Sequence, residues 1–151
     1  MITFPAGPLL FDTGIYIRFT RGEDYSWLGE DARIFQRTIL TAVVAAELYA
    51  GTHDKWEKRS LDDLCRAHSS LGRFLSPPAA AWVELGILLR RGRKLFGKLD
   101  FPRHFRDVLI ALEAARAGAT LVTENVKDFR RWQTLLASGK RKLKLFDPSE
   151  N

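Results

Sequence analysis

Four acidic residues stand where their surroundings make a charge unexpected. Asp12 is the first charged residue of the chain and follows a short apolar run. Glu47 is the only charged residue of an apolar stretch rich in Ala and Val. Asp107 lies near the start of an amphipathic stretch, and Asp128 lies in a polar segment after a second apolar run. A buried carboxylate is costly unless it is paired or bound to a metal, so these residues are candidates for chemistry.

Each carboxylate also has a purely structural interpretation. Asp12 could form an Asx turn or cap the next helix, and Glu47 could lie at the rim of its helix. Asp107 would interact favourably with the positive end of a helix dipole. Asp128 could cap a segment that begins at Phe129. Taken singly, each acid could therefore be structural or functional. The strands and helices predicted around the four acids show whether they can come together.

The strands predicted around these acids form a parallel sheet. The apolar runs 8–11 and 119–123 are typical of strands buried on both faces. Segment 38–40 is a further short strand, and the alternating segment 142–146 is an edge strand. Helical stretches separate the strands, which predicts one α/β domain over 1–151, with a central parallel sheet flanked by helices.

Local end signals give the expected limits of four helices. Helix-breaking segments are expected at Ser76-Pro77-Pro78 and at Phe101-Pro102. In chain order, the expected helices are 42–50 between the N-cap Thr41 and Gly51, 61–75 after the N-cap Ser60, 79–91 before Gly92, and 105–115 before Gly118.

These elements would gather the four carboxylates at one edge of the sheet. Asp12 and the 123–128 loop follow two parallel strands, whose carboxyl ends share the edge where ligands bind. Glu47 and Asp107 stand on helices that could reach this edge. Carboxylates gathered there raise one another's pKa values, and a divalent cation relieves the repulsion. Oxygen ligands without Cys or His suit Mg²⁺ or Mn²⁺, which activates water for phosphodiester hydrolysis.

Four motifs follow one another along the chain: LFDT at 10–13, AELYAG at 46–51, RDVLIALEAA at 106–115 and LVTENVKDF at 121–129. In this order and spacing the sequence resembles PIN-domain ribonucleases. Within that family it is most similar to the VapC-type toxins of prokaryotic toxin–antitoxin pairs. The resemblance covers nearly the whole chain. It implies a PIN-like α/β fold, RNA cleavage with Mg²⁺ or Mn²⁺, a homodimer and a cognate antitoxin protein.

The resemblance also implies roles for individual residues. The first acid of the family, its helix Glu and its third acid correspond to Asp12, Glu47 and Asp107, which are expected to hold the metal and act in catalysis. The hydroxyl positions of the family correspond to Thr13 and Thr123, which are expected to position the substrate.

One position departs from the family pattern. Many members carry a fourth acid where this chain has Asn125, although Asn also occurs there. We predict that Asn125 or Asp128 completes the metal site, and that Asp128 supplies any fourth negative charge. Whether the site holds one or two ions stays open.

The composition of the chain indicates which partners it could bind and in which compartment it is expected. Lys and Arg number 24 against 18 Asp and Glu, a net charge of +6 that attracts polyanions such as RNA. The basic clusters 90–94 and 140–142 are either phosphate contacts or a solvated surface. A single cysteine, Cys65, excludes an intrachain disulfide and a thiolate-rich metal site. Without a signal peptide or an apolar run long enough for a membrane span, a cytoplasmic protein is expected.

The sequence therefore predicts a Mg²⁺- or Mn²⁺-dependent endoribonuclease, the toxin of a type II toxin–antitoxin system, with water as the nucleophile. The alternative is a catalytically weak PIN-fold module that binds nucleic acid or a protein partner. Trp82, Leu85, Leu88 and Leu89 could form a dimer or antitoxin face, although packing in the core is favoured for them.

Overall fold

The computed structural model describes residues 2–150 and contains one five-stranded parallel sheet in the order β3-β2-β1-β4-β5. The strands are β1 (Leu9–Phe11), β2 (Thr38–Thr41), β3 (Phe74–Leu75), β4 (Thr120–Val122) and β5 (Lys144–Phe146). In the central register, Leu10 lies between Ile39 and Leu121. All residues of β1, β2 and β4 are buried, as in strands covered on both faces. The predicted parallel α/β fold is confirmed.

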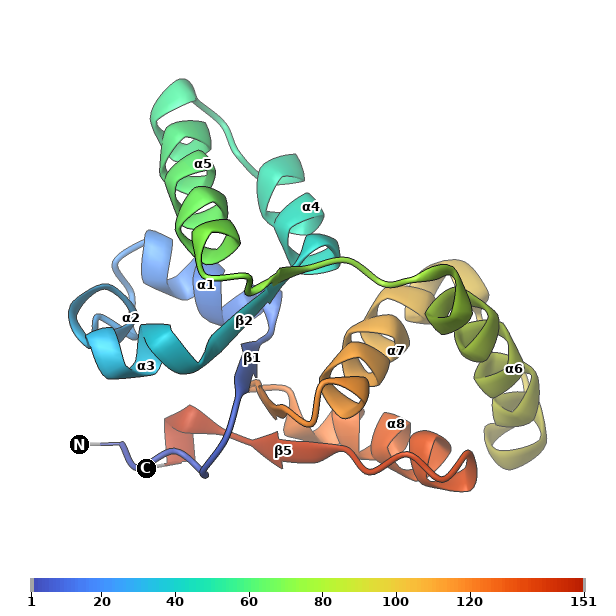
Figure 1. The fold of residues 1–151 in the computed structure, drawn as a ribbon. Helices are drawn as coiled ribbons and strands as arrows, with labels where there is room; N and C mark the ends of the chain where they lie inside the picture. The colour runs from blue at the N-terminus through green and yellow to red at the C-terminus, as the bar shows by residue number, and fades with distance from the viewer. Residues whose placement is uncertain (1, 151) are drawn as a thin grey trace.

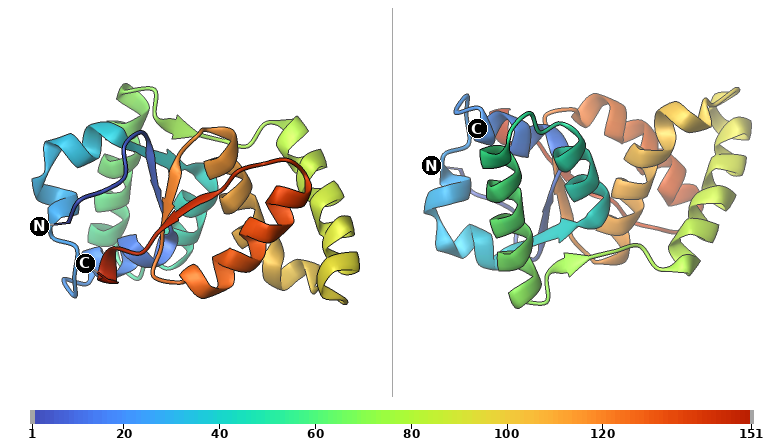
Figure 2. Two further views of the ribbon diagram at one scale, coloured as in Figure 1. Left: turned by 90° about the horizontal axis from the view of Figure 1, so that it is seen from below. Right: turned by 90° about the horizontal axis from the view of Figure 1, so that it is seen from above.

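Helices cover the sheet and extend beyond it. They are α1 (Thr13–Thr20), α2 (Trp27–Glu30), α3 (Ala32–Arg37), α4 (Ala42–Ala50), α5 (Lys55–Ser70), α6 (Ala79–Phe96), α7 (Phe101–Arg116), α8 (Val126–Ser138) and a final 3-10 turn (Pro148–Glu150). Figure 1 shows α4 and α5 together at one end of the molecule and α6 at the opposite end, with α7 between them. The same arrangement is seen from below and above in Figure 2.

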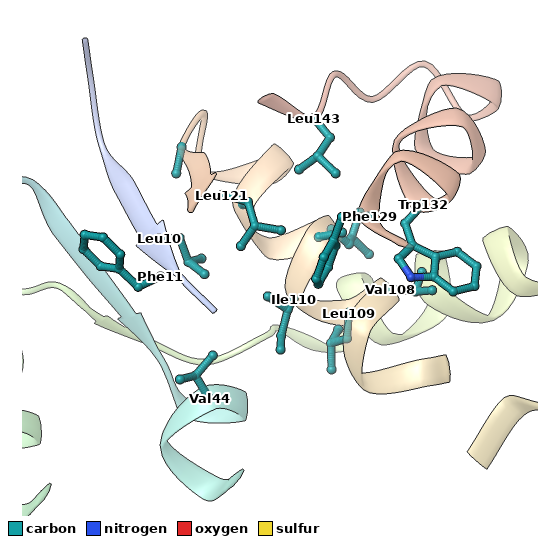
Figure 3. Close-up of a cluster of buried hydrophobic side chains, with 14 of the residues drawn as sticks. Leu10, Phe11, Val44, Val108, Leu109, Ile110, Leu121, Phe129, Trp132 and Leu143 are labelled. Carbon is teal, nitrogen blue, oxygen red and sulfur yellow. The ribbon is translucent and has the colours of Figure 1, made fainter. Parts of the chain in front are cut away.

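The core is centred on β1, β4 and α7. The side chains of Leu10, Leu109, Leu121 and Trp132 meet there, from two strands and two helices (Figure 3). Residues 108–112 of α7 are fully buried, so this helix runs through the interior. Asp107 immediately precedes this buried run and therefore lies at the boundary between core and surface.

The local end signals were correct for both ends of α4, for the start of α6 after Pro78 and for the end of α7 before Gly118, and wrong for both ends of α5. Thr41 caps α4 as predicted, because its hydroxyl accepts a hydrogen bond from the Val43 N–H at 3.2 Å. The Ser60 cap was wrong. Asp54 caps α5 instead, since its carboxylate accepts hydrogen bonds from two backbone N–H groups at 2.9 Å each. A stronger cap six residues upstream therefore sets the helix start.

The predicted breaks at Gly92 and at Phe101-Pro102 were also wrong. Gly92 is buried inside α6, which continues to Phe96, and a Cβ at this position would lie 2.6 Å from Cδ1 of Leu99. The glycine thus leaves room for the Leu99 side chain and does not end the helix. Phe101 and Pro102 form the first turn of α7, where proline is tolerated because its missing N–H has no intrahelical partner. Within residues 2–150, no helix is both long enough and apolar enough to cross a membrane.

Candidate active site

Asp12 stands where β1 ends and α1 begins. Its Oδ1 accepts a hydrogen bond from the Thr13 N–H at 2.8 Å, and its Oδ2 accepts one from the Thr123 hydroxyl at 2.9 Å. Burial raises the pKa of Asp12, the two hydrogen bonds lower it, and the charge of Glu47 raises it again. Asp12 is therefore the N-cap of α1, as its structural interpretation predicts, and its carboxylate is held in one orientation at the sheet edge.

Glu47 reaches the same edge from α4. The Thr13 hydroxyl donates to its Oε1 at 3.1 Å, and an Nη of Arg106 lies 3.5 Å from its Oε2. The Glu47 side chain retains 24% of its exposure. Thr13 thus joins the first two acids, because its backbone binds Asp12 and its hydroxyl binds Glu47. Both threonines expected to position substrate bind carboxylates in this structure, since the Thr13 hydroxyl donates to Glu47 and the Thr123 hydroxyl donates to Asp12.

Asp107 is half-buried in the second turn of α7. Its pKa is raised to about 6, first by burial and then by the negative charges of Asp12 and Glu47, while Arg106 lowers it and Asp128 adds a smaller upward effect. The helix begins at Phe101, so the predicted role of Asp107 at the positive end of a helix dipole was wrong. The dipole effect fades within the first turn. The electrostatic neighbours of Asp107 are the other candidate acids, as the gathering of charges at this edge predicts.

Asn125 and Asp128, the remaining candidate residues, lie at the start of α8. Asn125 is the N-cap of α8; its backbone N–H donates to the Thr123 hydroxyl at 3.0 Å and its amide Nδ2 donates to Asp128 Oδ2 at 3.1 Å. Asp128 therefore lies within the first helical turn and does not cap a segment starting at Phe129. Asp128 acts on the other acids through its charge, which raises the pKa of Asp107.

The donor chemistry of this edge fits a hard divalent cation. The carboxylate and hydroxyl oxygens of Asp12, Glu47, Thr13 and Thr123 converge there, and such oxygen ligands suit Mg²⁺ or Mn²⁺. Within the described part of the chain, no three Asp, Glu, His or Cys side chains form a group ready to share one ion. Glu47 is held by Thr13 and Arg106. An ion shared by the acids would therefore compete with the Arg106 guanidinium for Glu47.

Sequence reasoning missed two features of this edge. Arg106 immediately precedes Asp107, and only its position could have signalled its pairing with Glu47. Glu124, next to Thr123, accepts hydrogen bonds from the Tyr25 hydroxyl and from Arg18. These partners lie about a hundred residues away in the chain, so no local pattern reveals them. Together they tie the loop after β4 to α1 and to the segment after it.

Each of the two basic clusters, 90–94 and 140–142, has one arginine that is bound to another part of the protein. Arg91 donates to the Ser138 carbonyl at 2.6 Å, and Arg141 binds Glu84 through two hydrogen bonds of 2.8 and 2.9 Å. The rest of 90–94, apart from the buried Gly92, is exposed. Leu85, Leu88 and Leu89 are buried in the core, whereas Trp82 is exposed. The preference for core packing is thus confirmed for the leucines and wrong for the tryptophan.

No family model and no curated protein matches the sequence. Solved structures match it over almost its whole length. A chain of VapBC2 from Rickettsia felis, bound to a DNA fragment from the promoter, aligns with a TM-score of 0.64 over 92% of this chain and 97% of its own, at 22% identity. The fold is PIN-like.

Two further structures agree. FitAcB from Neisseria gonorrhoeae aligns with a TM-score of 0.64 over 95% of this chain and 99% of its own, at 21% identity. VapBC-1 from nontypeable Haemophilus influenzae aligns with a TM-score of 0.62 over 93% and 98%, also at 21% identity. The structural neighbours of the chain are thus PIN-domain toxin complexes, and the resemblance predicted from the four motifs is confirmed at the level of the fold.

Proposed function

We propose that the chain is a Mg²⁺- or Mn²⁺-dependent endoribonuclease and the toxin of a type II toxin–antitoxin pair. The observation that carries this proposal is the environment of Asp107. The Asp107 carboxyl is half-buried, and this burial together with the negative charges of Asp12 and Glu47 raises the pKa of Asp107 to about 6. Three acids, one directly after β1 and the others on α4 and α7, repel one another at the carboxyl edge of the sheet and are suited to holding a divalent cation.

In this proposal each residue has a distinct task. Asp12, Glu47 and Asp107 supply anionic oxygens to the ion, and Asp128 adds a fourth negative charge beside Asn125. The ion supplies Lewis-acid chemistry, since it polarises a phosphate and makes water a better nucleophile. The backbone of Thr13 and the hydroxyl of Thr123 keep the Asp12 carboxylate oriented. Above pH 6, Asp107 is mostly ionised and able to bind a cation.

The proposed partners are RNA, an antitoxin and a second copy of the chain, in the cytoplasm. The net charge of +6 supports attraction to RNA. The structural neighbours VapBC and FitAB are complexes, which supports an antitoxin partner for this chain. Apolar side chains on β3 and α6 support a protein interface, because they are exposed: Phe74, Leu75, Trp82, Val83 and Ile87.

The Arg106–Glu47 ion pair favours a second candidate, a catalytically weak module that keeps the fold and binds RNA or a protein. A guanidinium can satisfy a carboxylate in place of a metal. If Arg106 merely competes with the ion, Arg106→Ala should raise the affinity for Mn²⁺ several-fold at pH 8, as measured by calorimetry. If Arg106→Ala leaves the protein unable to bind Mn²⁺, the module is favoured over the nuclease.

Metal dependence of RNA cleavage tests the proposed function. The purified protein should cleave RNA in Mg²⁺ or Mn²⁺, lose this activity in EDTA, and regain it when the ion is restored. Binding of RNA is measured in parallel, in Ca²⁺ or without metal. Retained RNA binding without cleavage under any metal condition would reject the nuclease and support the binding module.

A further inference from the structure

A cavity of about 180 Å³ that is partly open to solvent lies beside the second half of α7. It is bounded by β2, by the segment that joins β3 to α6, and by the second half of α7. Figure 2 shows this joining segment running from the edge of the sheet to α6. Most of the wall is apolar, formed by Leu10, Ile39, Leu75, Pro78, Ala81 and Ala117. Asp12, Glu47 and Asp107 take no part in it.

Glu113 supplies the carboxyl group of this cavity. It follows Asp107 by six residues, which separates the two by about 9 Å along the helix axis and by roughly 240° around it. The Glu113 residue is 9% exposed, and the Thr41 hydroxyl donates to its Oε1. Burial raises its pKa to about 7, and the hydrogen bond from Thr41 opposes that rise. The carboxylate thus lies in a mostly apolar cavity with one neutral hydrogen-bond partner.

The cations near this cavity are engaged elsewhere. Arg116 contributes to the wall, but its guanidinium pairs with Glu84 at 3.0 Å. Arg141 pairs with the same Glu84 at 2.8 Å. Among residues 2–150, no Lys, Arg or His forms an ion pair with Glu113. A buried carboxylate in an apolar cavity is most stable with a cationic partner, and here the protein does not provide one.

We propose that this cavity is a binding site for an alkylammonium group, with the Glu113 carboxylate facing the ammonium and the apolar walls enclosing the hydrocarbon stem. An apolar cavity of about 150 Å³ holds a ring the size of benzene, so this one suits a stem of about four to six carbon atoms. A free aliphatic amine and a lysine side chain of a partner offer the same chemistry. The proposal does not depend on nuclease activity.

The charges around the site set the direction of the pH dependence. An ammonium binds the ionised form of Glu113, whose pKa is about 7. Thr41 on the β2 side is neutral, Arg116 on α7 stays charged, and Arg141 holds the pKa of Glu84 on α6 below its usual range. Glu113 is therefore the group that titrates near neutrality. Affinity should rise by about tenfold from pH 6 to pH 8, because the amine remains protonated throughout.

Calorimetric titration with n-butylamine, and with 1-butanol as its uncharged analogue, tests the proposal. Wild-type protein should bind the amine more tightly than the alcohol, and more tightly at pH 8 than at pH 6. Glu113→Gln keeps the shape and the hydrogen bond from Thr41 but removes the charge, and should weaken amine binding by about tenfold or more. Glu30→Gln is the matched control, and should leave binding unchanged because Glu30 is an exposed carboxylate on α2 that takes no part in the cavity.

A readout in the wild-type protein avoids any effect of the substitution on folding. The side-chain carboxyl carbon of Glu113, followed by NMR, should titrate at a lower pH when butylamine is saturating. Binding of n-butylamine but not of Nα-acetyl-lysine amide assigns the site to free amines, and the reverse assigns it to a lysine of a partner. Failure of both to bind, or equal binding by Glu113→Gln, would overturn the proposal.

Discussion

The surroundings of Asp107 oppose its ionisation. Burial, Asp12 and Glu47 all raise its pKa, and only the Arg106 guanidinium opposes them. Such an arrangement destabilises the fold and is typical of functional sites. The sequence identified Asp107 as a candidate, but assigned its structural role to the helix dipole because the start of α7 was placed too late.

The raised pKa predicts the direction of a stability change. Folded Asp107 holds its proton up to about pH 6, whereas the unfolded chain releases it near 3.8. Its contribution is therefore favourable at low pH and is lost as the pH rises from about 4 to 6. Asp107→Asn should stabilise the fold at pH 8 by about 1–2 kcal/mol, after allowance for solvent screening, and by much less at pH 4.

Urea unfolding of wild type and Asp107→Asn at the two pH values measures this effect. Asp63→Asn serves as a control, because Asp63 is an exposed carboxylate paired with Arg66. Its substitution should change stability little at either pH. A loss of stability in Asp107→Asn at pH 8 would mean that Asp107 is structural, contrary to this account.

At the scale of elements, Thr41 links the two helices that carry Glu47 and Asp107. Its hydroxyl accepts from the Val43 N–H at the start of α4 and donates to Glu113 on α7. Thr41→Ala should destabilise the protein by about 2–3 kcal/mol, because α4 loses its cap and Glu113 loses its hydrogen bond. The loss should be larger at pH 8 than at pH 5, because the hydrogen bond favours the ionised Glu113, whose pKa is about 7.

Thr41→Ser is the matched variant for this measurement. It retains the hydroxyl, so denaturant unfolding should show less than half of the loss seen with alanine. Equal destabilisation by serine and alanine would show that the methyl group, and not the hydrogen bonds, matters at this position.

Elements whose signals are local could be predicted from the sequence, whereas those decided by distant contacts could not. The cap of α4 is local, because Thr41 and Val43 are two residues apart. Gly92 resembles a helix end, yet it lies inside α6, where it leaves room for the side chain of Leu99. Strand β3 has two exposed residues and exists through its pairing with β2, so its own pattern carries no signal.

At the scale of the whole molecule, the sheet order explains why the acids meet. β1 and β4 are parallel neighbours, so Asp12 and Thr123 follow strands that end at the same edge and bind each other. This convergence could be predicted because it needs only the strand direction. The ties of Glu47 to Arg106 and of Glu113 to Thr41 could not, since they depend on how α4 and α7 pack against each other.

The exposed apolar side chains of α6 predict self-association. Val83 and Ile87 are 63% and 53% exposed and lie one turn apart on the same helix face. Light scattering should find a dimer at micromolar concentration, and Ile87→Glu should shift it to a monomer because a charge at an apolar interface is costly. Trp56→Glu, at an exposed aromatic residue on α5, should leave the dimer intact. A wild-type monomer would contradict the prediction.

The most direct test of the central claim is the rate of RNA cleavage in Mn²⁺ by wild type and by Asp12→Asn, Glu47→Gln and Asp107→Asn. Each variant removes one charge while keeping the shape of the side chain, and thermal unfolding verifies that each still folds. All three variants should lose turnover, while Asp63→Asn should cleave at the wild-type rate. Cleavage at the wild-type rate by any one of the three folded variants, or cleavage that EDTA does not reduce, would contradict the central claim.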